Sequence, residues 1–473
     1  MDENIFRQYD IRGIVGEQLT DEVVSQLGRA IGRFFAERNS RRIAVGYDAR
    51  KSSPRYFELL TTTLTECGLD VVNIGMVPTP VLYDTVFTKP VDGGVMITGS
   101  HNPPDHNGFK ICLGKDALFG EQIQEIRELA LSEPPAPLLP EEGWIPTKSG
   151  DGVVRAAGGQ SLGSIASLNV LDDYIAHITS SIHIGPRKLR VVIDAGNGMG
   201  GVTAVPVLEK LGVELIELYT EPDSNFPNHH PDPTVPENLI DLVEAVTAYS
   251  ADIGIAFDGD GDRIGVVDET GRIIWGDELM VLLERSVLAE LPGSTIIAEV
   301  KCSQTLFDDI ERHGGKAVMW KAGHSLIKAK MKETGAVLAG EMSGHIFFAD
   351  RYYGYDDATY AAARIVEILS YTDKTLSDLL SDLPQTFSTP EIRVPCPEER
   401  KFDVVAKVAE HFSTTNQVIT IDGARIVFKN GWGLVRPSNT QAILVLRFEA
   451  DSQASLDVIR DTVEEKVNEI ISQ

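Results

Sequence analysis

The chain has 473 residues, of which 42% are hydrophobic, and its formal net charge is −27. This length predicts about three domains, and the negative charge argues against binding to nucleic acid or to an anionic membrane surface. There is no long apolar run and no signal-peptide pattern, and the four cysteines are too scattered for a disulfide framework or a cysteine-ligated zinc. These features favour a cytoplasmic globular protein that must gather positive charge locally to bind an anionic substrate.

The first third of the chain predicts alternating strands and helices. A helical pattern covers 21–38, with Thr20 as its N-cap. Short apolar runs and one further helical segment follow, namely strands at 42–47, 70–74 and 93–97 and a helix at 55–67. Apolar strands that alternate with helices predict a mainly parallel sheet covered on both faces.

A serine follows the third of these strands. The segment Thr98-Gly99-Ser100-His101-Asn102-Pro103-Pro104 joins a strand end to a proline-rich loop, and Lys110 comes soon after it. A serine hydroxyl acts as a nucleophile only where a base, an anion-stabilising site or a metal activates it. Taken alone, Ser100 fits a turn-capping role as well as a catalytic one.

The same order of strands and helix recurs twice. The second copy has strands at 189–193, 213–218 and 252–257 and a helix at 203–211, and the third has strands at 294–298, 316–320 and 336–339 and a helix at 304–313. In open α/β sheets ligands bind beyond the carboxyl ends of the strands. The loops at these ends carry the unusual residues, which include Asp258, Asp260, Asp262, Arg263, Lys301, His324, Glu341, Ser343 and His345. We therefore expect these loops and the Ser100 loop to share one cleft.

Three aspartates alternate with glycines in Asp258-Gly259-Asp260-Gly261-Asp262-Arg263. Carboxylate oxygens on a flexible loop suit a hard cation such as Mg²⁺ or Ca²⁺. An EF-hand begins in a similar way, but Arg263 stands where that loop requires glycine, and the segment follows a strand instead of a helix. A solvated acidic turn is the third interpretation.

A glycine-rich turn supports a rival hypothesis. Gly196-Asn197-Gly198-Met199-Gly200-Gly201 fits the pattern of dinucleotide-binding folds, with Glu217 in the place of the ribose-binding acid. A dinucleotide-dependent oxidoreductase is therefore an alternative. It leaves the serine, aspartate and arginine loops unexplained.

After Pro390 the pattern becomes that of a small α+β domain with antiparallel strands. Its turn Arg436-Pro437-Ser438-Asn439-Thr440 is rich in hydrogen-bond donors. A serine nucleophile, a cation loop and the guanidinium groups of Arg12, Arg263 and Arg436 together make up the parts needed for phosphoryl transfer. The sequence has no Walker loop, which leaves Ser100 itself as a carrier of the phosphate.

In these motifs and their order the sequence resembles the α-D-phosphohexomutase superfamily over nearly the whole chain. The phosphoserine loop matches 98–104, the metal loop 258–263, the sugar loop 340–345 and the phosphate loop 436–440. The resemblance implies three similar α/β domains with mixed, mainly parallel sheets and a C-terminal α+β domain, around a central cleft. The expected domains are 1–167 with a linker excursion at 134–167, 168–272, 273–386 and 387–473.

The resemblance also implies the reaction. Ser100 is expected to carry a phosphoryl group and to interconvert hexose 1-phosphate and hexose 6-phosphate, of mannose or glucose, through a hexose 1,6-bisphosphate that also serves as activator. Mg²⁺ would be held by Ser100, Asp258, Asp260 and Asp262, with Arg12, His101 and Lys110 as further catalytic residues. The implied substrate-binding residues are Tyr9, Arg263, Lys301, His324, Glu341, Ser343, His345, Arg436, Ser438, Asn439 and Thr440.

Neighbouring activities stay open at this point. Met342 is similar to the phosphomannomutase/phosphoglucomutase branch, whereas phosphoglucosamine mutases usually have glutamine there. A phosphoserine-dependent sugar phosphatase and a non-catalytic sugar-phosphate sensor are alternatives of other classes. Gly99 stands where the family often has alanine, a change that frees the backbone and removes no ligand. Small sugar phosphates are the expected partners, and the sequence does not define the oligomeric state.

Overall fold

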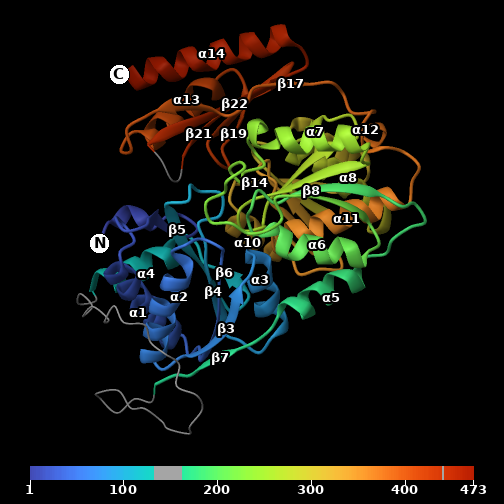
Figure 1. Cartoon of the computed structure of the whole chain (residues 1–473). Helices are drawn as coiled ribbons and strands as arrows, with labels where there is room; N and C mark the ends of the chain where they lie inside the picture. The colour runs from blue at the N-terminus through green and yellow to red at the C-terminus, as the bar shows by residue number, and fades with distance from the viewer. Residues whose placement is uncertain (133–161, 439–441, 473) are drawn as a thin grey trace. The chain divides into compact units, whose positions relative to one another are not determined.

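The computed structural model describes residues 1–132, 162–438 and 442–472 (Figure 1). The chain forms two compact units. The first unit consists of Met1–Ile274 and Ser343–Leu376, and the second of Trp275–Met342 and Ser377–Gln473. Most of the predicted linker excursion, together with Asn439 and Thr440, lies outside the described residues. No described helix is long and apolar enough to cross a membrane.

The first sheet of the first unit has the order β1-β5-β4-β2-β3-β7, with β6 beside β5. The neighbours β4-β2-β3-β7 are parallel, and β5 is antiparallel to β4 and β1. The strands are β1 (Ile11–Ile14), β2 (Arg42–Tyr47), β3 (Asp70–Met76), β4 (Gly93–Ile97), β5 (His106–Leu113), β6 (Asp116–Ala117) and β7 (Ile165–Ser167). Helices α1 (Asp21–Glu37), α2 (Ser53–Glu66) and α4 (Glu121–Ser132) lie on one face, and α3 (Thr79–Thr88) lies on the other (Figure 1).

Local sequence explains most of these elements. Thr20 caps α1 as predicted, because its hydroxyl accepts a hydrogen bond from the amide of Val23 at 3.3 Å. All five residues of β4 are buried, as expected for a central strand. Helix α3 escaped prediction because residues 79–86 are buried on all sides, so the segment has no polar face to reveal a helical period.

The second sheet of the first unit has the order β12-β11-β10-β8-β9. Strands β10-β8-β9 are parallel, and β11 and β12 continue the sheet in antiparallel fashion. The strands are β8 (Arg190–Asp194), β9 (Glu214–Leu218), β10 (Ile253–Phe257), β11 (Ile264–Asp268) and β12 (Ile273–Ile274). Other elements of this unit are β16 (Ile346–Phe348), α5 (Leu171–Ser181), α6 (Gly200–Lys210), α7 (Ile240–Tyr249), α11 (Ala358–Ser370), and the short 3₁₀ helices Glu3–Ile5 and Pro236–Leu239.

The glycine-rich turn before α6 allows close packing against the aspartate loop. A Cβ on Gly198 would lie 2.9 Å from the Cα of Gly259, and the amide of Met199 donates to the carbonyl of Gly259 at 3.0 Å. Glu217, which a dinucleotide site would use, is exposed and accepts a hydrogen bond from Thr220 at 2.8 Å. The glycines therefore have a packing role, and the oxidoreductase hypothesis loses its main support.

The second unit contains a parallel set of strands and an antiparallel sheet. Strand β13 lies between β14 and β15 and is parallel to both, and the antiparallel sheet has the order β17-β22-β21-β20-β19 with β18 beside β22. The strands are β13 (Thr295–Glu299), β14 (Lys316–Trp320), β15 (Leu338–Gly340), β17 (Phe387–Ser388), β18 (Ile392–Pro395), β19 (Gln417–Ile419), β20 (Ala424–Phe428), β21 (Gly431–Pro437) and β22 (Ile443–Ala450). The helices are α8 (Gly276–Glu290), α9 (Gln304–Arg312), α10 (His324–Thr334), α13 (Lys401–Ser413) and α14 (Gln453–Ser472), and a short helix α12 (Leu376–Leu379) joins the units.

The three predicted copies share one topology. In each, the third strand of the copy pairs in parallel with the first, and the first pairs with the second, which gives the orders β4-β2-β3, β10-β8-β9 and β15-β13-β14. Ser100, Asp258 and Glu341 follow the third strand of the three copies. The predicted fold class, three α/β domains and a C-terminal α+β domain, is confirmed. The prediction that the unusual residues follow equivalent strands in the three copies is also confirmed.

A buried carboxyl group in α8 provides a test of the packing. Glu284 is fully buried beside Asp309 of α9, and burial raises the pKa of Glu284 to about 9 from its ordinary 4.5. The stability is full at low pH and is lost as the pH rises from the unfolded pKa to the folded pKa, because in this range the unfolded chain ionises while the buried carboxyl stays neutral. We expect Glu284→Gln, which cannot ionise, to gain stability relative to the native chain by up to about 1.4 kcal/mol per pH unit between about pH 5 and pH 9.

Urea unfolding at several pH values measures this difference. Glu290→Gln, which changes an exposed glutamate at the end of the same helix, is the matched control and should follow the native chain. Parallel pH profiles for Glu284→Gln and the native chain would contradict the prediction.

Candidate active site

Ser100 lies three residues beyond β4 in a strained backbone conformation. Its φ of +49° is uncommon for a residue with a side chain, and its amide donates to the hydroxyl of Thr98 at 2.8 Å. The Ser100 hydroxyl is buried, donates to Asp258 Oδ2 at 2.9 Å, and lies 3.1 Å from His101 Nδ1. Backbone strain at a buried hydroxyl that contacts a carboxylate and an imidazole is typical of a functional residue.

The three aspartates form one cluster in the loop after β10. Asp258, Asp260 and Asp262 are fully buried, and one oxygen of each lies within 4.8 Å of the others. Burial, together with the charges of Asp262 and Asp260, raises the pKa of Asp258 well above its ordinary value. Within the described residues, Asp260 Oδ1 and Asp262 Oδ1 accept no hydrogen bond. Buried carboxylate oxygens without donors are suited to a hard divalent cation.

Lys110 connects the serine strand to this cluster. It lies on β5, opposite Met96 of β4, and its ammonium contacts Asp260 Oδ2 at 2.7 Å and also Asp262 Oδ2. Burial alone would lower the pKa of Lys110, but the two carboxylates raise it above the ordinary value. Thr79, the first residue of α3, adds a hydrogen bond of 2.6 Å from its hydroxyl to Asp260 Oδ2. The cluster therefore combines buried negative charge with a buried cation.

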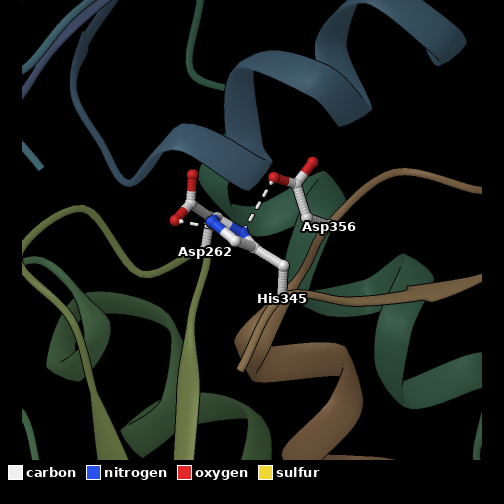
Figure 2. Close-up of side chains that lie close together, drawn as sticks. All are labelled: Asp262, His345 and Asp356. Atoms are coloured by element: carbon white, nitrogen blue, oxygen red, sulfur yellow. Dashed lines mark ion pairs between the residues drawn. The ribbon is translucent and has the colours of Figure 1, made fainter. Parts of the chain in front are cut away.

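Figure 2 shows His345 between two of the carboxylates of the first unit. Its Nδ1 lies 3.1 Å from Asp356 and 3.6 Å from Asp262, so the carboxylates favour the tautomer with the proton on Nδ1. Arg263 Nε donates to His345 Nε2 at 3.0 Å, and the two residues also form an antiparallel backbone bridge. The aspartate loop and the loop that contains His345 are therefore joined at both the backbone and the side chains.

The N-terminal segment supplies another guanidinium to the first unit. Arg12 lies on β1, opposite Gly108 of β5, and pairs with Asp10 at 2.5 Å. Tyr9 comes just before this strand and is half-buried. Burial and the guanidinium groups of Arg263 and Arg12 lower the pKa of His101 well below its ordinary value. Predicted residues from three loops of the first unit, together with Arg12 of β1 and Lys110 of β5, thus form one polar cluster.

In the second unit, Lys301 follows β13 and is held by two glutamates. Its ammonium lies 2.8 Å from Glu391 and 3.3 Å from Glu299. The charge of Lys301 lowers the pKa of Glu391 to about 2, and burial raises the pKa of Glu299. Lys301 is therefore a fixed, ionised group at a strand end.

The loops after β14 and β15 also meet in the second unit. Glu341, which follows β15, accepts a hydrogen bond from the amide of Gly323 at 2.7 Å, and His324 begins α10 next to that glycine. Arg436, at the end of β21, pairs with Asp422 at 2.9 Å, and Asp422 also accepts from the amide of Ala322 at 3.1 Å. The ammonium of Lys401 donates a hydrogen bond of 2.6 Å to the carbonyl of Ser438 and anchors that residue. Ser343 belongs to the first unit.

Sequence reasoning missed the acidic partners of the predicted cations. Asp10, Asp356, Asp422, Glu299 and Glu391 each pair with a predicted site residue. Asp10 and Glu299 lie only two residues before their partners, where no known motif marks them. Asp356, Asp422 and Glu391 lie in other segments than their partners, so sequence spacing could not reveal these pairs. The sequence offered one indirect signal. A lysine or arginine at the end of a buried strand is expected to be buried as well, and a buried cation requires a carboxylate close by.

The first unit therefore has the groups for phosphoryl transfer. A serine hydroxyl can act as nucleophile, three carboxylates can hold a divalent cation, and Lys110 with two guanidinium groups can stabilise phosphoryl oxygens. The second unit presents Lys301, Glu341 and Arg436, which are suited to hydroxyl groups and to a phosphate.

Comparison with known proteins agrees with this chemistry. Four family models match the chain, described as phosphoglucomutase/phosphomannomutase alpha/beta/alpha domains I, II and III and the C-terminal domain. They cover residues 3–135, 172–271, 275–387 and 391–466.

Individual relatives are similar over nearly their whole length. The chain is 46% identical to a phosphomannomutase/phosphoglucomutase of Pseudomonas putida, covering 97% of this chain and 94% of the relative. It is 47% identical to a phosphoglucomutase of Neisseria gonorrhoeae, covering 97% and 95%. A crystal structure of a phosphoglucomutase/phosphomannomutase family protein from Burkholderia thailandensis has a TM-score of 0.88 and 41% identity, covering 99% of this chain and 98% of that one.

Proposed function

The chain belongs to the phosphoglucomutase/phosphomannomutase family, and we propose that it interconverts hexose 1-phosphates and hexose 6-phosphates of mannose and glucose. It is an enzyme of the mutase class, as its relatives are. The phosphoglucosamine mutase alternative is not favoured, because the similar relatives named above carry the phosphomannomutase and phosphoglucomutase names. One observation carries the proposal most directly: the strained, buried Ser100 donates to Asp258 within the aspartate cluster.

Ser100 is the proposed nucleophile and phosphoryl carrier. Its hydroxyl lies within hydrogen-bonding distance of His101 and Asp258, which can accept its proton. Asp258, Asp260 and Asp262, with Ser100, fit Mg²⁺ because they offer oxygen ligands, two of which accept no hydrogen bond from the described residues. When bound, Mg²⁺ supplies charge neutralisation for the transferring phosphoryl group. Lys110 and Arg12 are proposed to stabilise phosphoryl oxygens from the neighbouring strands.

The proposed substrate contacts come from both units. In the first unit they are Tyr9, Arg263, Ser343 and His345, and in the second they are Lys301, His324, Glu341, Arg436 and Ser438, with Asn439 and Thr440 outside the described residues. Glu341 and Ser343 are proposed to bind sugar hydroxyls. Arg436 and Ser438 are proposed to hold the phosphate that does not react, whichever end of the sugar carries it.

A single serine can serve both directions of the reaction. Ser100 gives its phosphoryl group to the substrate, which forms a hexose 1,6-bisphosphate, and it regains a phosphoryl group from the other end of that intermediate. A trace of hexose 1,6-bisphosphate is therefore the proposed activator. We retain the four domains expected from the sequence, 1–167, 168–272, 273–386 and 387–473, as part of this proposal.

A coupled assay tests the function. The purified protein, Mg²⁺ and a trace of glucose 1,6-bisphosphate are combined with mannose 1-phosphate, glucose 1-phosphate or glucosamine 1-phosphate, and kcat/KM is compared. Similar values for the first two sugars are expected. A strong preference for glucosamine 1-phosphate would contradict the proposed specificity, release of inorganic phosphate at the same rate would indicate a phosphatase, and no turnover would favour a sensor.

Arg436 tests the proposed phosphate clamp. The structure holds its guanidinium beside Asp422 at the end of β21, so a substrate phosphate would meet an oriented fork of donors. Arg436→Ala is expected to weaken binding by roughly 1.5–3 kcal/mol, the scale of a charge-assisted hydrogen bond, which appears as a KM about 10- to 100-fold higher. Arg460→Ala, which removes an exposed arginine of α14, is the control. An unchanged KM for Arg436→Ala would exclude this residue from the clamp.

A further inference from the structure

A single buried arginine holds the carbonyl groups of the serine loop. Arg50 lies between β2 and α2, and its side chain is 2% exposed. Its Nη2 donates to the carbonyls of Ser100 at 2.8 Å and Asn102 at 2.6 Å. Its Nη1 donates to the carbonyls of Pro103 at 2.5 Å and His106 at 3.0 Å. One guanidinium therefore binds four carbonyls within a stretch of seven residues, from Ser100 to His106.

The loop has two backbone hydrogen bonds of its own, from Asn102 to Gly99 at 2.9 Å and from His106 to Pro103 at 3.0 Å, and neither binds the carbonyl of Ser100. Pro103 and Pro104 have no amide hydrogen to donate, and Ser100 is held at a φ of +49°, a conformation that is unfavourable for a residue with a side chain. Strained residues persist only where surrounding contacts determine their conformation. The carbonyl of Ser100 itself is one of the groups that Arg50 binds.

Asp48 orients the arginine and also contacts the loop. Asp48 Oδ2 lies 3.2 Å from Arg50 Nε and accepts a hydrogen bond from the amide of Gly99 at 3.1 Å. Its other oxygen accepts from the hydroxyl of Ser53 at 2.6 Å and from the amide of Arg50 at 3.0 Å. Both buried residues thus bind the segment around the nucleophile, and neither belongs to any motif identified in the sequence.

Gly99 provides the space that the guanidinium occupies. A Cβ at this position would lie 2.5 Å from Arg50 Cζ and 2.8 Å from the carbonyl oxygen of His106. The φ of Gly99 is not among the positive values of the chain, so the expectation that this glycine frees the backbone is wrong. In this chain the guanidinium of Arg50 fills the space that a methyl group on residue 99 would take.

We propose that Arg50 is a positioning residue that holds Ser100 in its reactive conformation, by fixing the carbonyls on both sides of the loop. The proposal rests on the mutase function proposed above. Arginine is suited to this role because its planar guanidinium presents five donors in a fixed geometry, whereas the lysine ammonium is a compact group with three. Arg50 acts on the phosphoryl carrier and on no substrate group, so its loss should lower kcat and leave KM nearly unchanged.

The experiment compares Arg50→Lys with Arg364→Lys in the full-length protein. Arg364 is an equally buried arginine of the same unit, 1% exposed, and pairs with Asp350 at 2.9 Å away from the serine loop. Two quantities are measured for each: kcat and KM in the mutase assay, and the rate at which glucose 1,6-bisphosphate phosphorylates Ser100, followed by intact-protein mass spectrometry. Both are normalised to the folded fraction determined from circular dichroism.

Arg50→Lys is expected to lower kcat and the phosphorylation rate by about 10²-fold, the effect of misplacing a reacting group by about 1 Å. KM should stay within about threefold. Arg364→Lys should keep the native kcat per folded molecule. If the folded Arg50→Lys protein has the native kcat, or if both variants lose kcat equally, the positioning role is wrong.

Asp48→Asn decides the case in which Arg50→Lys does not fold. It keeps the arginine and removes the charge that orients it, so it should also lower kcat and the phosphorylation rate while KM is retained. A fully active Asp48→Asn protein would overturn the proposal. An inactive native protein would instead contradict the mutase function, which separates the two failures.

Discussion

Ser100→Ala is expected to lower kcat by more than about 10⁴-fold on both mannose 1-phosphate and glucose 1-phosphate, because the variant has no oxygen to carry the phosphoryl group. The Ser100 hydroxyl contacts Asp258 and lies beside His101, and the alanine variant loses the only hydroxyl of this hydrogen-bonded group. Steady-state turnover with and without glucose 1,6-bisphosphate measures the effect. The activator should not restore activity, since a bisphosphate can regenerate only an enzyme that has lost its phosphate.

A control variant and a binding measurement show whether the effect is specific to the Ser100 hydroxyl. Ser132→Ala, which changes an exposed serine at the end of α4, should be fully active. Equilibrium binding of glucose 1-phosphate to Ser100→Ala should persist, because the proposed phosphate clamp is in the second unit. Undiminished turnover by Ser100→Ala would show that the phosphoryl group does not pass through this serine and would return the protein to the sensor or another class.

The sequence predicted those parts of the fold in which local pattern and burial agree. Strand β4 was predicted with its observed bounds, and the parallel order of strands recurs in all three copies. Helix α3 was missed because it is buried on all sides, and α6 begins at Gly200, three residues before the predicted start. In α6 the glycines have low helix propensity, and packing against Phe257 and Thr220 requires them there.

The residues of the candidate site also fall into two groups, those that the sequence pattern could predict and those that it could not. Motif residues such as Asp258 and Lys110 could be found because their chemistry is concentrated in short segments or at strand ends. Asp356, which contacts His345, and Arg50, which binds the serine loop, could not be found, because their partners are distant in sequence. The sequence alone does not show which charged residues of different loops pair with one another, and this pairing decides which buried charges are stable.

Removal of the divalent cation is expected to lower kcat by about 10³-fold or more without unfolding the protein. A cation at the aspartate cluster would contribute several kcal/mol of stabilisation to the transferring phosphoryl group, and each 1.36 kcal/mol corresponds to about a factor of ten in rate. The fold should survive because Lys110 already contacts Asp260 and Asp262 and offsets part of their charge. Exhaustive chelation, with elemental analysis of the metal content, kinetics and circular dichroism on the same sample, measures both effects.

Single substitutions assign the effect to the cluster. Asp260→Asn should raise the Mg²⁺ concentration needed for half-maximal activity, because an amide oxygen replaces a charged ligand. Asp268→Asn is the matched control, since Asp268 is equally buried in the same unit but accepts hydrogen bonds from Thr270 and Arg272 at the end of β11. The control is expected to lose stability through this turn and to keep the native Mg²⁺ dependence. If metal-free protein keeps its kcat, or if both substitutions shift the Mg²⁺ dependence equally, the aspartate cluster is not the cation site, and Lys110 and the guanidinium groups alone must neutralise the phosphoryl group.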